Sequence, residues 1–254
     1  SSPRPPFGGY GPSMTNPKTG EIIGADIMLE FVHFTNRVFY DKLFVDASAA
    51  MNLETLEELQ LKDALEKSPL YCSLGSVMHE NMLFGTTFLQ MMNAPDFELE
   101  KIKKESMKAL IMHEIGHTLG LNHNMKASQL FSPEELYNAD FIEGKALTGS
   151  VMDYAGLNIN PNREEQGQYA DTAVGPYDIW AIQFGYQSFQ NENERNALLE
   201  RSTEKELIFG NDADDMRSPG KAIDPRVMTG DLSSDPKQYS IDRIQLVNRL
   251  KNDI

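Results

Sequence analysis

The spacing of apolar residues divides the chain into a short extended part followed by helices. Residues 20–34 combine β-branched and aromatic side chains with partial alternation, which predicts a strand. Residues 85–92 (GTTFLQMM) form a second strand candidate. Asn52 suits a helix N-cap, and the leucines that follow it at helical spacing predict a helix over residues 52–67.

Further helices are predicted downstream. A long one runs from about Asp96 to Leu119 and places apolar residues on one face. Ser132 and Glu135 form a capping box around Pro133, which predicts the start of a short helix. Later helices are expected at residues 195–205 and 241–250, and a polar loop at residues 158–175.

The long predicted helix carries the most informative pattern of the chain, HEIGHTLGLNH at residues 113–123. Because residues four apart on a helix share a face, His113 and His117 lie side by side and can bind one metal ion. Glu114 lies about 100° around the helix axis and flanks that ion.

Gly120 follows one turn after His117. Glycine adopts positive φ at little cost and commonly ends helices, so the chain can turn back there and bring His123 to the same ion. Three imidazole nitrogens leave one position of a tetrahedral zinc open for water, as in catalytic sites. Zinc acidifies that water and polarises a carbonyl, and Glu114 is placed to act as base and then as acid. The alternative is a helix whose histidines bind no metal and make ordinary surface or core contacts, but the fixed spacing of the whole pattern disfavours it.

Residues 113–123 fill every fixed position of HExxHxxGxxH and so resemble the metzincin signature. Residues 150–154 (SVMDY) resemble the methionine turn of that clan. The resemblance implies that Met152 lies beneath the metal as an apolar floor and contacts the histidines without being a ligand. It also implies that Tyr154 stabilises the tetrahedral oxyanion, as in astacin-like and serralysin-like members; a tyrosine that only packs under the turn is the alternative. Asn124 departs from the pattern, since astacins have Glu at this position and adamalysins have Asp.

A closer resemblance extends over most of the chain, from about Gly11 to Pro236. Its motifs are NPKTGEII, HEIGHTLGLNHN, SVMDYAG and GPYDIWAIQFGY. They are similar to those of a family of large bacterial zinc-dependent metalloproteases, long exported proteins whose catalytic domain is flanked by other domains. The resemblance implies export, to the periplasm, the outer membrane or the extracellular space.

The metzincin resemblance also implies the fold. We expect an α+β domain with a twisted mixed sheet, a long active-site helix and a mostly helical or irregular C-terminal part. A helix is implied at residues 176–184, after the methionine turn. The clan pairs its substrate with a sheet-edge strand upstream of the active helix, and residues 85–92 suit that edge better than residues 20–34.

The chain length of 254 residues allows one substantial core, or a core with a small subdomain. We expect a catalytic domain at residues 1–190, with a helical insertion at about 35–84, and a helical and loop extension at residues 191–254 that leads to a missing downstream domain. The chain begins without methionine, so we expect it to be part of a longer precursor. The single Cys72 excludes an internal disulfide and slightly disfavours an oxidising compartment.

The net charge of −15 argues against nucleic acid or an anionic membrane surface as a partner. Apolar runs are too short to span a bilayer. Calcium could bind at Asp212, Asp214 and Asp215, but EF-hand spacing and its closing Glu are missing, so a solvated acidic loop is favoured.

These observations predict a zinc-dependent endopeptidase that acts on a peptide or protein substrate, with His113, His117 and His123 as zinc ligands. One alternative is a zinc amidase that acts on a non-peptide cell-wall substrate, which the metal site does not exclude. Another is a non-catalytic zinc-containing binding module, against which Glu114 argues because such a module needs no base.

Overall fold

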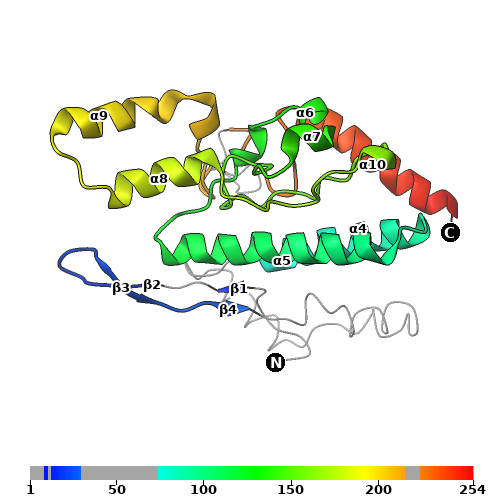
Figure 1. Cartoon of the computed structure of the whole chain (residues 1–254), viewed down its shortest axis with the longest axis horizontal. Coiled ribbons are helices and arrows are strands. Elements are labelled where there is room, and N and C mark those ends of the chain that lie inside the picture. Colours follow the sequence, from blue (N-terminus) through cyan, green and yellow to red (C-terminus); the bar gives the residue numbers. More distant parts are fainter. Residues whose placement is uncertain (1–8, 11–12, 30–73, 215–223, 254) are drawn as a thin grey trace.

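The structure, a computed structural model, describes residues 9–10, 13–29, 74–214 and 224–253 (Figure 1). The helix predicted over residues 52–67 and the cysteine Cys72 lie outside these residues.

Two long helices, α4 (Leu74–Met91) and α5 (Asp96–Thr118), run through the middle of the molecule as a hairpin (Figure 1). Asn93, with a φ of 52°, makes the tight connection between them. The strands lie along one side of α5, and the chain that follows α5 covers the other side (Figure 1). The helices of that later part are α6 (Pro133–Tyr137), α7 (Ala139–Ile142), α8 (Pro176–Tyr186), α9 (Glu192–Glu200) and α10 (Pro236–Asp253).

The described strands form two short antiparallel ladders. Strand β1 (Gly9–Tyr10) pairs with β4 (Met28–Leu29), and β2 (Ser13–Thr15) pairs with β3 (Ile22–Ala25). The extended structure predicted for residues 20–34 is therefore confirmed as far as Leu29. Together with the helices, these strands confirm the α+β class, although within the described residues they make a smaller sheet than the twisted mixed one that we expected.

The strand predicted at residues 85–92 is wrong, because these residues belong to the second half of α4. Phe88 and Leu89 are fully buried there, and Met82, two turns before Leu89 on the same helix, is buried as well. Gly85 lets α4 pack closely against α5, because a Cβ at this position would lie 2.6 Å from Ile102 Cδ1. Close packing between the two helices thus outweighs the β propensity of the neighbouring threonines.

One apolar core joins segments that are far apart in the sequence. It includes Leu110 of α5, Tyr154 and Leu157 after the methionine turn, and Leu246 and Leu250 of α10. The division predicted at residue 190 would thus separate two parts that share this core, and it stays a prediction.

The predicted helices after α5 are confirmed, with shifted ends. The capping box at Ser132 is present: its hydroxyl accepts from Glu135 N, and the Glu135 carboxylate accepts from Ser132 N. The loop predicted at residues 158–175 contains one 3-10 turn, Arg163–Glu165. Helices α8, α9 and α10 correspond to the segments expected at residues 176–184, 195–205 and 241–250. Among the described residues, no helix combines the length and apolar character needed to cross a bilayer.

Candidate metal centre

Helix α5 ends where the sequence pattern predicts. Gly120 has a φ of +86°, its N–H bonds to His117 O at 3.0 Å, and Leu121 N bonds to Gly116 O at 3.0 Å. This pair of hydrogen bonds is a Schellman motif, which requires a residue with positive φ at the position of Gly120. The chain therefore reverses directly after the helix and returns His123 to its side.

The three predicted histidines come together. One ring nitrogen of each of His113, His117 and His123 lies within 4.8 Å of the other two, and the described residues contain no other group of this kind that could hold a metal ion. The Nε2 atoms of His117 and His123 are 3.0 Å apart. His113 is fully buried, and the other two side chains are partly buried.

Each histidine uses its Nδ1 atom to contact a hydrogen-bond acceptor. His113 Nδ1 lies 2.7 Å from Val151 O, and His117 Nδ1 lies 3.1 Å from Leu121 O. His123 Nδ1 lies 2.9 Å from a carboxylate oxygen of Asp212. Because carbonyl and carboxylate oxygens accept hydrogen bonds, Nδ1 carries the proton in each ring, and the Nε2 lone pair is left for a metal.

The surroundings of His113 and His117 favour the neutral form of these two rings. Burial, followed by the nearby His117 and His123, lowers the pKa of His113 well below its usual value. Burial and the neighbouring His123 lower the pKa of His117 to about 4. Neutral imidazole is the form that binds metal ions.

These donors fit zinc. Two Nε2 lone pairs that face one another at 3.0 Å repel unless a cation lies between them. Nitrogens bound to one tetrahedral zinc are separated by roughly 3.3 Å, as follows from zinc–nitrogen distances of about 2.0–2.1 Å. The set of three imidazole nitrogens therefore suits a catalytic zinc ion with one position open.

The methionine turn (residues 150–154) lies directly against the histidine-bearing helix. Met152 is fully buried. A Cβ at Gly116 would lie only 2.2 Å from Met152 Sδ, so the thioether occupies the space that a side chain at position 116 would need. Met152 thus lies against α5 at Gly116, the residue directly before His117.

Glu114 and Tyr154 also lie at the cluster. Glu114 is fully buried beside His113 on α5. The Tyr154 hydroxyl is 3.2 Å from His123 Nε2, the ring atom that faces the other histidines. Glu114 thus lies on the helix that carries two of the histidines, and Tyr154 lies on the turn that contacts the third, while their catalytic roles stay predictions.

Asp178 supports the methionine turn, and sequence reasoning missed it. This buried carboxylate accepts hydrogen bonds from Ser150 Oγ at 2.5 Å, Val151 N at 2.9 Å and Gly175 N at 2.8 Å. Since Val151 O is the acceptor for His113, Asp178 acts on the metal centre through one residue. The available signal was the Gly-Pro-x-Asp start of α8, where an Asp at the third helical position often caps the helix.

Asp212 was considered from the sequence only as a possible calcium ligand, and its contact with His123 was missed. It is exposed, as expected for a solvated acidic loop, but its carboxylate reaches His123. The calcium site considered at Asp212, Asp214 and Asp215 stays a prediction, because Asp215 lies outside the described residues.

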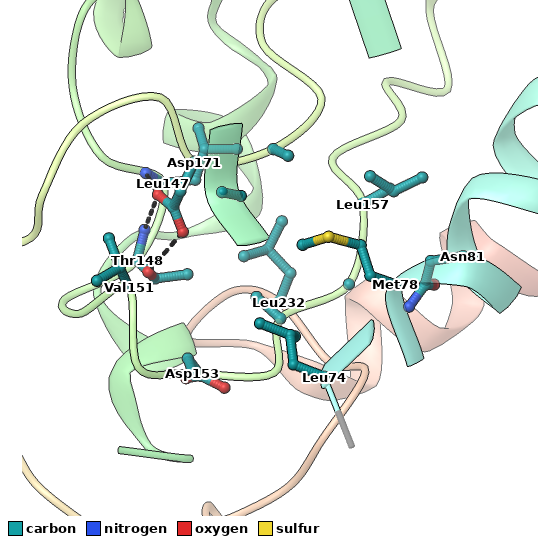
Figure 2. A pocket seen from close by; sticks show the side chains of 14 residues that line it. Leu74, Met78, Asn81, Leu147, Thr148, Val151, Asp153, Leu157, Asp171 and Leu232 are labelled. Atoms are coloured by element: carbon teal, nitrogen blue, oxygen red, sulfur yellow. Dashed lines mark hydrogen bonds between the residues drawn. The ribbon is translucent and has the colours of Figure 1, made fainter. Parts of the chain in front are cut away.

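A cavity of about 30 Å³ lies beside the methionine turn, and the three histidines are not among the described residues that line it (Figure 2). Its polar lining includes Asp153 and Asp171, and Asp171 bonds to the segment that leads into the turn through Leu147 N and Thr148. This volume holds about one or two water molecules. The cavity therefore belongs to the support of the turn and not to the histidine cluster.

In a comparison with known protein families, residues 96–254 match the family described as Met-zincin. The matched residues make up more than half of the chain. The match begins with α5 and includes the histidines, the methionine turn and α10. No curated protein and no solved structure matches the chain.

Proposed function

Because the chain belongs to the Met-zincin family, we propose that it is a zinc-dependent endopeptidase in which His113, His117 and His123 hold the metal and Glu114 is the general base. The observation that carries the proposal is the convergence of three imidazoles, each held through Nδ1, beside a buried glutamate. A bound zinc ion would acidify a water molecule and polarise the scissile carbonyl.

The side chains around this site have separate tasks in the proposed reaction. Glu114 takes a proton from the attacking water and delivers it to the leaving amine nitrogen. Its burial supports this role, since a carboxylate that is shielded from bulk water keeps the transferred proton at the site. The Tyr154 hydroxyl donates a hydrogen bond to the oxyanion that forms from the carbonyl.

Met152 is proposed as the floor of the site. Its thioether fills the space beside Gly116 and so fixes the turn of α5 that carries His113 and His117. A soft, unbranched side chain suits this place because it adapts to an irregular gap without offering a competing charged ligand.

The proposal is tested with the Glu114→Gln variant, which keeps the shape of the side chain and loses the base. Wild type and variant are incubated with a mixed peptide library, and the products are identified by mass spectrometry. We expect cleavage to fall by about 100-fold or more, because general base catalysis contributes about 10²–10⁴-fold. Zinc content, measured in the same samples, should be equal in the two proteins, and a chelator should abolish wild-type cleavage.

Equal cleavage by wild type and Glu114→Gln would contradict the endopeptidase mechanism. A parallel incubation with purified cell-wall material separates the amidase alternative, since products released from cell wall but not from peptides would replace the proposed substrate class. Binding of peptides or glycans without any product would favour the binding module.

Export and flanking domains are the remaining part of the proposal. They are supported by the resemblance to long exported metalloproteases, and the division at residue 190 belongs with them. Fractionation of cells that produce the native protein, with detection of the zinc domain in each fraction, tests the location.

A further inference from the structure

His123 differs from the other two histidines in the group that holds it. His113 and His117 face backbone carbonyls, Val151 O and Leu121 O. His123 instead faces the carboxylate of Asp212, at 2.9 Å and 89 positions later in the sequence. The Asp212 side chain is 64% exposed, so nothing in its immediate packing requires a carboxylate there.

The segment that delivers Asp212 is fixed by the neighbour of His123. Asn124 is fully buried, and its Oδ1 accepts from Gly210 N at 3.1 Å while its Nδ2 donates to Ile208 O at 3.0 Å. Met125 N also donates to Gly210 O at 2.7 Å. The two residues after His123 therefore hold the backbone just before Asp212 in register with it.

Gly210 allows this close approach. A Cβ there would lie 2.5 Å from Val227 Cγ2 and 3.3 Å from Lys126 Cβ. The segment is thus packed tightly two residues before Asp212, although the Asp212 side chain itself reaches into solvent. A surface ion pair formed by chance would not need such a buried connection.

We propose that Asp212 is a positioning residue of the metal centre, which fixes the orientation of His123 through Nδ1 and strengthens it as a metal ligand. This inference rests on the proposed zinc site. An anionic acceptor at Nδ1 increases electron density on the ring, so Nε2 becomes a stronger donor than it would be with a neutral acceptor. Asn124 contributes indirectly by holding the segment at residues 208–210.

The test measures zinc affinity with the full chain by competition against a chromophoric chelator, in wild type, Asp212→Ala, Asp212→Glu and Asp214→Asn. Loss of a partner behind a metal ligand typically lowers affinity by about 10–100-fold. We expect a loss in this range for Asp212→Ala and partial recovery in Asp212→Glu, which restores the charge. Asp214→Asn is the matched control, since it removes one charge from the same loop without contact to His123, and its affinity should stay within about twofold of wild type.

Cobalt provides a second readout that does not depend on turnover. The visible absorption bands of the cobalt-loaded protein report ligand geometry, and we expect them to shift in Asp212→Ala and not in Asp214→Asn. Wild-type zinc affinity and cobalt bands in Asp212→Ala would overturn the positioning role and leave the zinc site intact. Failure of the wild type itself to bind zinc would overturn the zinc site and this inference together.

Discussion

Helix α5 and the methionine turn face one another across the histidine cluster, but different interactions hold them in place. The helix depends on its own backbone hydrogen bonds and ends in a local glycine motif. The turn has no such regular ladder, and distant groups hold it instead: Asn124 N and Gly230 N donate to its carbonyl oxygens, and the buried carboxylate of Asp178 accepts from Ser150 and Val151. Its own Asp153 accepts from Ser128 N. One side of the site is therefore formed by neighbours in sequence, and the other by distant groups that include buried carboxylates, which must be desolvated.

The turn should accordingly be the side that is more easily broken. In Asp178→Ala, Ser150 Oγ, Val151 N and Gly175 N lose their shared acceptor inside the protein. We expect the free energy of unfolding in urea to fall by about 3–5 kcal/mol, because a buried donor without an acceptor costs about 1–3 kcal/mol.

Glu100→Ala is the matched control on the helix side. It also removes a carboxylate, but Glu100 is exposed and pairs only at the surface with Lys104. A change within about 0.5 kcal/mol is expected there. Similar losses in both variants would show that the turn is no more dependent on its carboxylates than the helix.

The contact between the two regions can be tested at Gly116. In an ordinary helix interior, Gly→Ala stabilises by about 1 kcal/mol. At Gly116 the new Cβ would lie 2.2 Å from Met152 Sδ, so either the turn or the helix must move. We expect Gly116→Ala to lower the free energy of unfolding by about 1–3 kcal/mol, as other overpacked cores do.

Gly185→Ala is the control for helix propensity. Gly185 also lies in a helix, α8, and a Cβ there would meet nothing within 4 Å. The urea midpoint should rise in this variant and fall in Gly116→Ala. A rise in both would mean that Met152 does not press against the helix in solution.

The same contrast explains what could be predicted from the sequence. The helix, its end at Gly120 and the grouping of His113, His117 and His123 follow from spacings within a few residues, so the sequence pattern was sufficient. Met152 and Tyr154 were located only because the SVMDY pattern resembles a known turn.

Predictions failed where distant segments decide the structure. Residues 85–92 have strand-like composition, but packing of Gly85 against Ile102 makes them helical. Asp178 and Asp212 act on residues 27 and 89 positions away, and no local pattern specifies such partners. An acidic loop was expected around Asp212, but its contact with His123 was not, and no role was predicted for Asp178.

The last prediction concerns pH and two buried aspartates that both bond to Ser128, Asp153 of the turn and Asp231. Burial raises the pKa of Asp231 to about 6, and burial together with the charge of Asp231 raises the pKa of Asp153. The native state therefore holds protons more tightly than the unfolded chain. The contribution of Asp231 to the free energy of unfolding is largest below about pH 4 and falls as the pH rises from about 4 to 6. Above that range it is constant, after a total loss of up to about 3 kcal/mol.

Asp231→Asn should remove this loss. The amide keeps an oxygen for Ser128 Oγ and Gln129 Nε2 and needs no proton to remain neutral. We expect the metal-free variant to be more stable than wild type by about 1–2 kcal/mol above pH 7, after a small loss for the weaker acceptor, and the difference to vanish near pH 4.

The histidines affect stability with the opposite sign, and the variant isolates the aspartate from them. Because the pKa values of His113 and His117 are lowered in the native state, their contribution is present above about pH 6.5 and is lost as the pH falls. Both proteins carry these histidines, so the contribution cancels in the difference between their urea unfolding curves across pH 4–8. If that difference does not change with pH, buried charge does not limit the stability of the turn, and its contrast with helix α5 must come from hydrogen bonding alone.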